Sequence, residues 1–229
     1  MTGAPSLWLS RARLRQDAGL AALGPLLLPP EDDRRADAAH RLVWSLFADA
    51  PDRARDFLWR EEAPGHFLIL SGRPPAEDGP LFAVESKAFA PALATGDRLA
   101  FLLRANATTA VRQEGRRGKP ADVVMHALHA LPQGERAARR ADAVREAGTA
   151  WLERQGERHG FRVDPGTLAV EGHDIRQVPR RSAAPIRYAV LDLAGHLEVR
   201  QPDLFLAAVA RGFGRARAFG CGLMLIRRP

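Results

Sequence analysis

The second half of the chain alternates between strand-like and helix-like segments in an order that few folds share. Residues 135–158 place Ala141, Val144 and Trp151 near one helical face, which predicts a helix. The other segments are an extended VVMHALHAL (123–131) before this helix and, after it, the strands TLAVEGHDIRQV and IRYAVLDLAGHLEV, a short helix at 201–212 and the closing strand GLMLIRR. The resulting order βαββαβ is that of a ferredoxin-like domain.

The first half follows the same order less completely. SLWLSRARL (6–14) alternates like a strand and precedes a loop at 15–31. A helix is expected from Asp32 or Asp33, because apolar residues from Ala39 to Phe47 recur on one face. RDFLWRE and HFLILSG then form two strands, and further strands follow without a convincing second helix. We therefore expect an α+β fold of two tandem ferredoxin-like (RRM-like) βαββαβ domains, the first with a degraded second helix.

The expected domain boundary is the segment RQEGRRGKP, which is polar, basic and rich in residues that break regular structure. It predicts an N-terminal domain at 1–112, a basic linker at 113–120 and a C-terminal domain at 121–229.

Charge and cysteine content limit the function classes. The net charge of +7 and a pI near 10.9 indicate a polyanionic partner, and phosphate backbones are the commonest. A single cysteine, Cys221, excludes an internal disulfide and a multi-cysteine zinc site. The carboxylates are scattered among arginines, so we expect neither metal nor cofactor. The longest apolar run is too short to span a membrane, so we expect a cytoplasmic protein without a membrane partner.

RGFGRARAFGCG (211–222) begins like the RNA-reading strand of an RRM but does not continue as one, and it also lacks the spacing of a dinucleotide-binding loop. Two interpretations of its residues remain open. The backbone N–H groups form an anion-binding nest deepened by the arginines, or the glycines serve a helix C-cap and a tight turn. The residues concerned are Arg211, Gly212, Gly214, Arg215, Arg217, Gly220 and Gly222.

Several segments together resemble one known family. They are HRLVWSLF (40–47), RDFLWR (55–60), LLRANAT (102–108), AWLERQGERHGF (150–161) and ARGFGRARAFGCGLMLI. In order and spacing they resemble the CasE family, the CRISPR-repeat endoribonucleases of the type I-E Cascade complex. The resemblance implies binding of the CRISPR repeat RNA hairpin and one metal-independent cut at its 3′ base. It further implies a cyclic phosphate product, which stays bound and joins the other Cascade subunits.

The resemblance also assigns site residues. The family's catalytic histidine falls on His40, and its usual tyrosine three residues earlier is replaced by Asp37, while the chain's only tyrosine is Tyr188. The glycine-rich loop corresponds to the four glycines between 212 and 222. The family's basic hairpin, which grips the RNA stem, corresponds to Arg176, Arg180, Arg181 and Arg187.

The residues themselves allow this chemistry. When RNA supplies its own 2′-hydroxyl as nucleophile, the protein needs only proton transfer and charge stabilisation, and a histidine with an ordinary pKa of about 6.5 can act as base or acid. Asp37 and Trp44 flank His40 at i−3 and i+4. We expect Asp37 to raise the pKa of His40 or orient its ring, and Trp44 to stack on a base or shield the site. The plainer alternative is a structural histidine and a packed tryptophan.

Three function classes follow from these observations. The first is a repeat-cleaving endoribonuclease. The second is a catalytically weak or inactive RNA-binding subunit of the same complex, which the missing tyrosine favours. The third is a ferredoxin-like protein-interaction module without RNA, which the positive charge disfavours.

Overall fold

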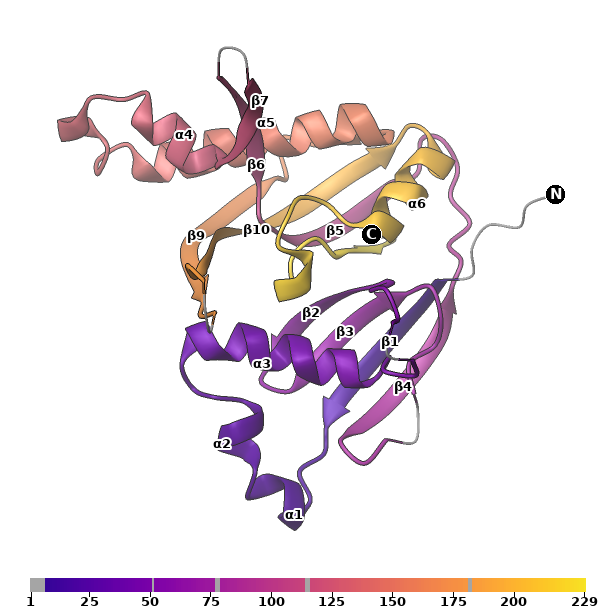
Figure 1. Ribbon diagram of the computed structural model, residues 1–229. Helices are drawn as coiled ribbons and strands as arrows, with labels where there is room; N and C mark the ends of the chain where they lie inside the picture. Colours follow the sequence, from indigo (N-terminus) through magenta and orange to yellow (C-terminus); the bar gives the residue numbers. More distant parts are fainter. Residues whose placement is uncertain (1–6, 51, 77–78, 114–115, 181–182) are drawn as a thin grey trace.

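The computed structural model describes residues 7–50, 52–76, 79–113, 116–180 and 183–229 (Figure 1). Its chain forms two main antiparallel sheets, one from each half, and a separate hairpin. No helix within these ranges is both long and apolar enough to cross a membrane.

The N-terminal sheet has the strand order β2-β3-β1-β4. Its strands are β1 (Leu7–Leu14), β2 (Phe57–Ala63), β3 (His66–Ser71) and β4 (Phe82–Phe89). The helix α3 (Asp32–Ser45) covers one face, because Ala39, Leu42 and Val43 pack against buried side chains of these strands. The order is that of a ferredoxin-like domain, and the described residues between β3 and β4 contain no helix. The expected loop before α3 contains two short helices, α1 (Ala18–Ala21) and α2 (Gly24–Leu27).

The C-terminal sheet has the order β11-β5-β10-β8, again ferredoxin-like. Its strands are β5 (Arg98–Ala105), β8 (Phe161–Val163), β9 (Ala169–Val178), β10 (Ile186–Val199) and β11 (Met224–Arg227). Short β8 and longer β9 pair with successive stretches of β10. The helices of this half are α4 (Val123–His129), α5 (Arg140–His159) and α6 (Pro202–Arg211), with the 3₁₀ turns η1 (Gln133–Glu135) and η2 (Arg217–Phe219).

The sheets divide earlier than the expected boundary at 113–120. Strand β5 lies before that boundary, yet it pairs with β10 and β11 in the C-terminal sheet. Its alternate residues Leu99, Phe101 and Leu103 are buried in the core of that half, which explains the pairing. The division therefore falls between β4 and β5, and the N-terminal half ends well before residue 112.

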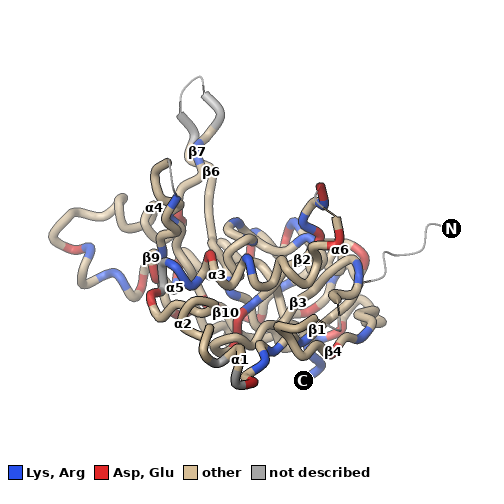
Figure 2. The backbone as a smooth tube through the Cα atoms, turned by 60° about the horizontal axis from the view of Figure 1, so that its bottom comes forward, with Lys and Arg blue, Asp and Glu red and all other residues tan. Residues whose placement is uncertain are grey.

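The expected linker is instead part of a hairpin, formed by β6 (Thr108–Gln113) and β7 (Arg116–Asp122). The hairpin projects beyond α5 in Figure 1, and Figure 2 shows the same projection from another side. Residues 123–129 after it were expected to be extended but form α4. The helix forms because Asp122 caps it, accepting a hydrogen bond from the backbone N–H of Met125 at 2.7 Å.

The two halves share one core. Leu58 and Leu70 lie on the face of the N-terminal sheet opposite α3, and both belong to the buried cluster of the C-terminal half. Their neighbours Trp59 and Ile69 point the other way, into the cluster under α3. This shared packing fixes the position of α3 relative to the C-terminal segment, and the candidate site lies between these two.

Candidate active site at the junction of the two halves

His40 is half-buried on α3 and faces the C-terminal segment. Its ring meets two aromatic rings edge-on, those of Trp44 and Phe219, each with a centroid distance of 6.1 Å. Trp44 comes from the same helix, one turn later, whereas Phe219 belongs to η2 near the end of the chain. The fold therefore brings His40 together with the glycine-rich segment, two features that the family resemblance assigned separately.

Trp44 is also packed against the N-terminal core. Its ring lies 5.2 Å from that of Phe57 at the start of β2, and it is only partly exposed. This contact matches the plainer alternative, a packed tryptophan, and the same ring also contacts His40.

Phe219 connects His40 to the only tyrosine of the chain. The rings of Phe219 and Tyr188 are stacked, with centroids 5.3 Å apart and planes 17° from parallel. Tyr188 is buried on β10, in a small cluster that also includes Ala36 of α3. The helix that carries His40 therefore packs directly against the C-terminal half.

Asp37 interacts with Arg41 rather than with the imidazole. The Asp37 Oδ2 to Arg41 Nη2 distance is 3.3 Å, and no hydrogen bond joins Asp37 to His40 among the described residues. The pKa of His40 is lowered, chiefly because burial disfavours its charged form and next because of the Arg55 charge. Asp37 acts in the expected direction, raising the pKa of His40, but burial and the nearby arginines outweigh it. His40 is therefore neutral near pH 7.

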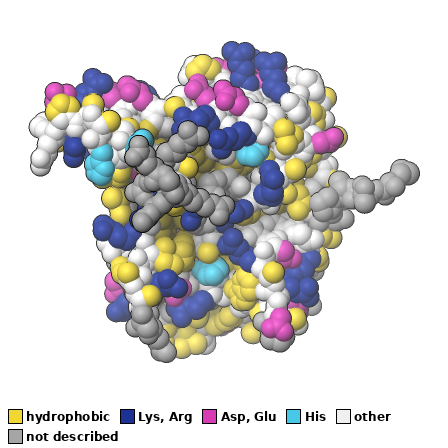
Figure 3. All heavy atoms as spheres, turned by 45° about the horizontal axis from the view of Figure 1, so that its top comes forward, with side chains coloured by type: hydrophobic (Ala, Val, Ile, Leu, Met, Phe, Trp, Pro, Cys, Tyr) yellow, Lys and Arg dark blue, Asp and Glu magenta, His cyan; other side chains and the backbone are white. Residues whose placement is uncertain are grey.

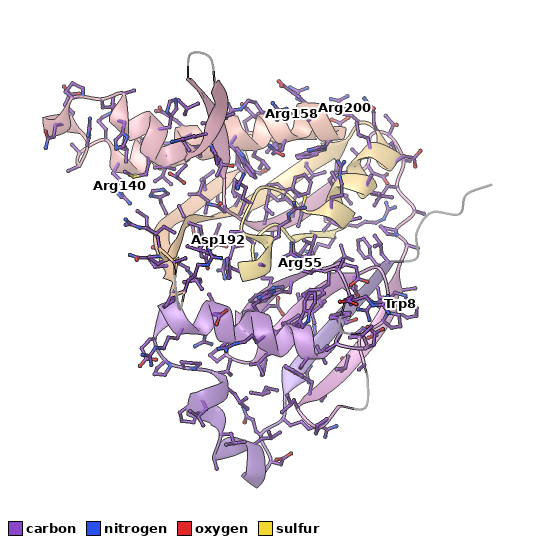
Figure 4. All side chains as sticks on the ribbon, viewed as in Figure 1. Trp8, Arg55, Arg140, Arg158, Asp192 and Arg200 are labelled. Atoms are coloured by element: carbon purple, nitrogen blue, oxygen red, sulfur yellow. The ribbon has the colours of Figure 1, made fainter. Side chains whose placement is uncertain are left out.

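Arg55 is a site residue that sequence reasoning did not single out. It lies just before β2, is half-buried, and makes no ion pair with a described residue. Burial lowers the pKa of Arg55, and the neighbouring charge of Arg217 lowers it further. Figure 4 shows Arg55 at the level of η2, between the halves. The only sequence signal for this position was an arginine directly before a buried strand.

The backbone of the glycine-rich segment is held against both halves by hydrogen bonds. The Gly222 N–H donates to the Arg104 carbonyl at 2.7 Å, and the Arg215 N–H donates to the Asn106 carbonyl at 3.1 Å. From the N-terminal half, the Trp59 indole N–H donates to the Ala218 carbonyl at 3.3 Å. These contacts place Phe219 and Arg217 beside α3.

Close packing and backbone conformation explain why glycine occupies these four positions. Gly212, which is the C-cap of α6, and Gly214, Gly220 and Gly222 all have positive φ angles. A Cβ atom on Gly214 would lie 2.6 Å from the Asn106 carbonyl oxygen, which is closer than real Cβ atoms approach. A Cβ atom on Gly220 would lie 3.2 Å from the Trp59 ring. The described geometry therefore matches the C-cap and tight-turn interpretation.

The arginines of this segment differ in placement. Arg211 and Arg215 are exposed, while Arg217 is partly buried and donates from Nη1 to the Arg211 carbonyl at 2.6 Å. Among these three, only Arg217 acts electrostatically on Arg55. Figure 3 shows one face of the molecule on which Lys and Arg side chains lie around exposed hydrophobic ones.

The arginines assigned to the basic hairpin lie on and around the turn between β9 and β10. Arg180 and Arg187 are exposed, and Arg181 lies outside the described residues. Arg176 is partly buried on β9 and lines a cavity between the halves. The structure thus separates Arg176 from the exposed pair.

A charged cluster crosses the junction close to this site. Arg104 of β5 binds Asp192 of β10 through two hydrogen bonds of 3.0 Å, and Arg60 of β2 approaches the same carboxylate at 3.8 Å. Buried Cys221 lies near these charges, and desolvation raises the pKa of its thiol to about 12. Cys221 is therefore a protonated packing residue. Within the described ranges, no group of three or more His, Cys, Asp or Glu side chains could hold a metal ion.

Comparison with known proteins identifies the class that this fold and site define. The sequence model of a family described as "CRISPR associated protein" matches residues 7–228. The chain belongs to the CasE family of these proteins.

Two curated relatives cover most of the chain. The CRISPR-associated endoribonuclease Cse3 of Thermus thermophilus is 28% identical over 242 residues, covering 96% of this chain and 99% of the relative. Cascade subunit CasE of Escherichia coli K12 is 25% identical over 194 residues, covering 81% of this chain and 88% of the relative.

Solved structures agree with the fold. Cse3 bound to a 19-nucleotide RNA has a TM-score of 0.70 at 27% identity, covering 98% of this chain and 100% of that one. Cas6e of Escherichia coli K-12 has a TM-score of 0.62 at 19% identity, with 97% and 100% coverage, and shows the fold alone.

Proposed function

We propose that this protein is an endoribonuclease that binds the hairpin of a CRISPR repeat RNA and cuts precursor CRISPR RNA at the 3′ base of that hairpin. The observation that carries the proposal is a neutral, half-buried His40 beside Arg55, an arginine without a carboxylate partner among the described residues. The relatives named as endoribonucleases, one of them bound to RNA, support the same function. We further propose that the product stays bound. Assembly with other Cascade subunits is supported by the name of the Escherichia coli relative, a CRISPR system Cascade subunit.

In the proposed reaction, the 2′-hydroxyl of the nucleotide before the cut attacks the adjacent phosphorus. Neutral His40 accepts the hydroxyl proton, because its lowered pKa leaves the ring nitrogen unprotonated near pH 7. The new bond between the 2′ oxygen and phosphorus gives a 2′,3′-cyclic phosphate, and the 5′ oxygen leaves and takes a proton from water. This chemistry needs no metal ion.

Arg55 and Arg217 stabilise the charge that develops on the phosphate. Their positive charges act on each other, so an anion between them relieves the repulsion while it gains charge-assisted hydrogen bonds. They take over the charge-stabilising work at a site whose family tyrosine is replaced by Asp37. Asp37 keeps a secondary role, since its charge partly offsets the effect of the arginines on the pKa of His40.

The remaining arginines grip the RNA. Arg180 and Arg187 are exposed beside the β9–β10 turn, and Arg211 and Arg215 are exposed on the glycine-rich segment. Arg181 belongs to the same basic turn by sequence. These side chains contact phosphates of the stem, which is recognised mainly by its shape and backbone. Trp44 shields His40 from water, and the four glycines keep η2 in place.

The direct test uses a labelled repeat hairpin in EDTA, with a second RNA that carries a 2′-deoxy nucleotide just before the cut. We expect the wild-type protein to cleave the first and spare the second, and His40→Ala to bind both without cleaving either. Undiminished cleavage by His40→Ala would falsify the catalytic role of the histidine.

A second candidate function is a catalytically weak or inactive RNA-binding subunit. It is favoured by Asp37, which stands where the family has a tyrosine and forms a salt bridge with Arg41. Tight hairpin binding by the wild-type protein with no cleavage in the same assay would establish this alternative.

A further inference from the structure

A cavity of about 290 Å³ lies between the two halves, next to the candidate active site. It is lined by residues of α3, β2, β5, β9 and the glycine-rich segment. Phe219 forms part of its wall, and the same ring contacts His40 at 6.1 Å. A molecule in the cavity is therefore separated from His40 by little more than one aromatic ring.

Part of the cavity wall is apolar. Trp59 and Phe219 contribute aromatic rings, and Ala36 and Ala39 contribute small side chains that leave space in front of α3. Gly220 adds backbone without a side chain. Walls of this kind suit a planar ring, and unstacked RNA bases are commonly bound against aromatic side chains.

Three charged side chains of the cavity lining, Arg35, Glu61 and Arg104, are already paired. Arg35 donates two hydrogen bonds to Glu61, at 3.2 and 3.0 Å, and Arg104 donates two to Asp192. These ion pairs stiffen the cavity wall. Because Arg35 and Arg104 already donate to carboxylates, they have fewer N–H groups to donate to a ligand.

Two other charged groups are available to a ligand. Glu62 comes from β2 of the N-terminal half and Arg176 from β9 of the C-terminal half. Neither side chain makes a hydrogen bond or salt bridge to any described residue. The cavity thus offers one acceptor and one cationic donor, one from each half, beside an aromatic wall. A nucleotide has matching parts, namely a planar base with N–H groups and a phosphate.

We propose that this cavity binds one unpaired nucleotide of the RNA, directly next to the cleaved bond. The inference rests on the proposed function, and it adds a binding site that determines which bond of the RNA is cleaved. The base lies against Trp59 and Phe219, its exocyclic amino group donates to Glu62, and its phosphate contacts Arg176. The volume is at the lower end of ligand pockets, roughly 300 to 1,000 Å³, so it admits one nucleotide and no base pair.

The first experiment measures base placement without cleavage. The full-length protein is mixed with repeat hairpins that carry a 2′-deoxy nucleotide before the cut and the fluorescent base 2-aminopurine at one of the two positions on each side of it. We expect one position to change its fluorescence on binding. That change should be lost in Arg176→Gln and kept in Glu153→Gln, a matched control on the exposed side of α5. An unchanged signal at all positions would contradict the proposal.

The second experiment measures base identity at the responsive position. Single-turnover cleavage is compared for RNAs with an amino-bearing base and with uracil there. We expect a preference of about tenfold for the amino-bearing base, and its loss in Glu62→Gln. Equal rates for both RNAs with wild-type protein would overturn the assignment of Glu62. If the wild-type protein cleaves no RNA but the fluorescence responds, the proposed function fails while the cavity proposal stands.

Discussion

Two groups of arginines lie at the junction of the halves, and they differ in whether a carboxylate neutralises them. Arg60 and Arg104 share Asp192, at 3.8 and 3.0 Å. Arg55 acts on His40, Arg217 acts on Arg55, and neither arginine has a carboxylate partner among the described residues. The first group joins one half to the other, whereas we propose that the second group binds a phosphate of the RNA. The comparison shows that arginines at one junction differ in whether a carboxylate neutralises them, and we propose that those without a carboxylate partner act in catalysis.

Among variants of these charged groups, the largest effect is expected from Arg55→Gln. Removing one group that stabilises charge in a transition state typically costs about 100- to 1,000-fold in rate. We expect a loss of this size in single-turnover cleavage, with little change in the melting temperature. The matched control is Arg53→Gln, two residues earlier, whose guanidinium binds Asp49 at 2.8 Å. Equal losses in both variants would show that the contrast between paired and unpaired arginines has no catalytic meaning.

Asp192→Asn should have the opposite effect, a loss of stability with little change in cleavage. It leaves Arg60 and Arg104 facing each other without a counter-charge, and we expect the free energy of unfolding to fall by about 1 to 2 kcal/mol, because the group is only partly buried. Chemical denaturation measures this loss, with Asp142→Asn on the surface of α5 as control. Cleavage by the folded variant should stay within a few-fold of wild type. A large loss of cleavage with unchanged stability would reverse the assignment of the two groups.

The pH dependence of cleavage tests the coupling between Arg55 and His40. Burial and Arg55 both lower the pKa of His40. Because a general base must be neutral, kcat/KM should rise with pH to a plateau, with a midpoint below 6.5. In Arg55→Gln one of the charges that lower the pKa is removed, so the midpoint should move to higher pH. A midpoint that stays in place would mean that Arg55 does not act on the imidazole.

The smallest effect is expected from the exposed arginines of the β9–β10 turn. Arg180→Gln and Arg187→Gln should each reduce the slope of log affinity against log salt by about 1, because each removes one phosphate contact. Cleavage at saturating protein should not change. Arg98→Gln is the control, since Arg98 is bound to Asp164 at 3.2 Å. An unchanged slope in the turn variants would place the RNA stem elsewhere.

Local patterns predicted much of the fold, because they act within one segment. The apolar face from Ala39 to Phe47 specified α3, and the strands on both sides of the basic turn form the β9–β10 hairpin. The same patterns could not say which sheet a strand joins. The alternation of apolar and polar residues in 98–105 would suit a strand of either sheet. Only burial against the helices of the C-terminal half decides which sheet this strand joins. The run VVMHALHAL looked extended, but the cap supplied by Asp122 favoured a helix.

The candidate site was predictable only in part. The family resemblance indicated His40 and the glycine-rich segment, and the structure brings both together through Phe219. Arg55 was missed because its meaning depends on a missing partner, which no local pattern reveals. The ion pair between Arg104 and Asp192 joins residues that are 88 positions apart in the sequence, so no rule based on local spacing could predict it. The cavity likewise forms only when the fold brings β2 of the N-terminal half close to β9 of the C-terminal half.

The most direct measurement is an NMR titration of the His40 ring in the free protein and in its complex with a hairpin carrying a 2′-deoxy nucleotide before the cut. His40→Ala assigns the signal. We expect a pKa below 6.5 in the free protein, since burial and Arg55 lower it, and a higher pKa in the complex, because a phosphate adds negative charge beside the ring. A pKa of His40 that is the same with and without this RNA would show that the phosphate does not lie at the histidine.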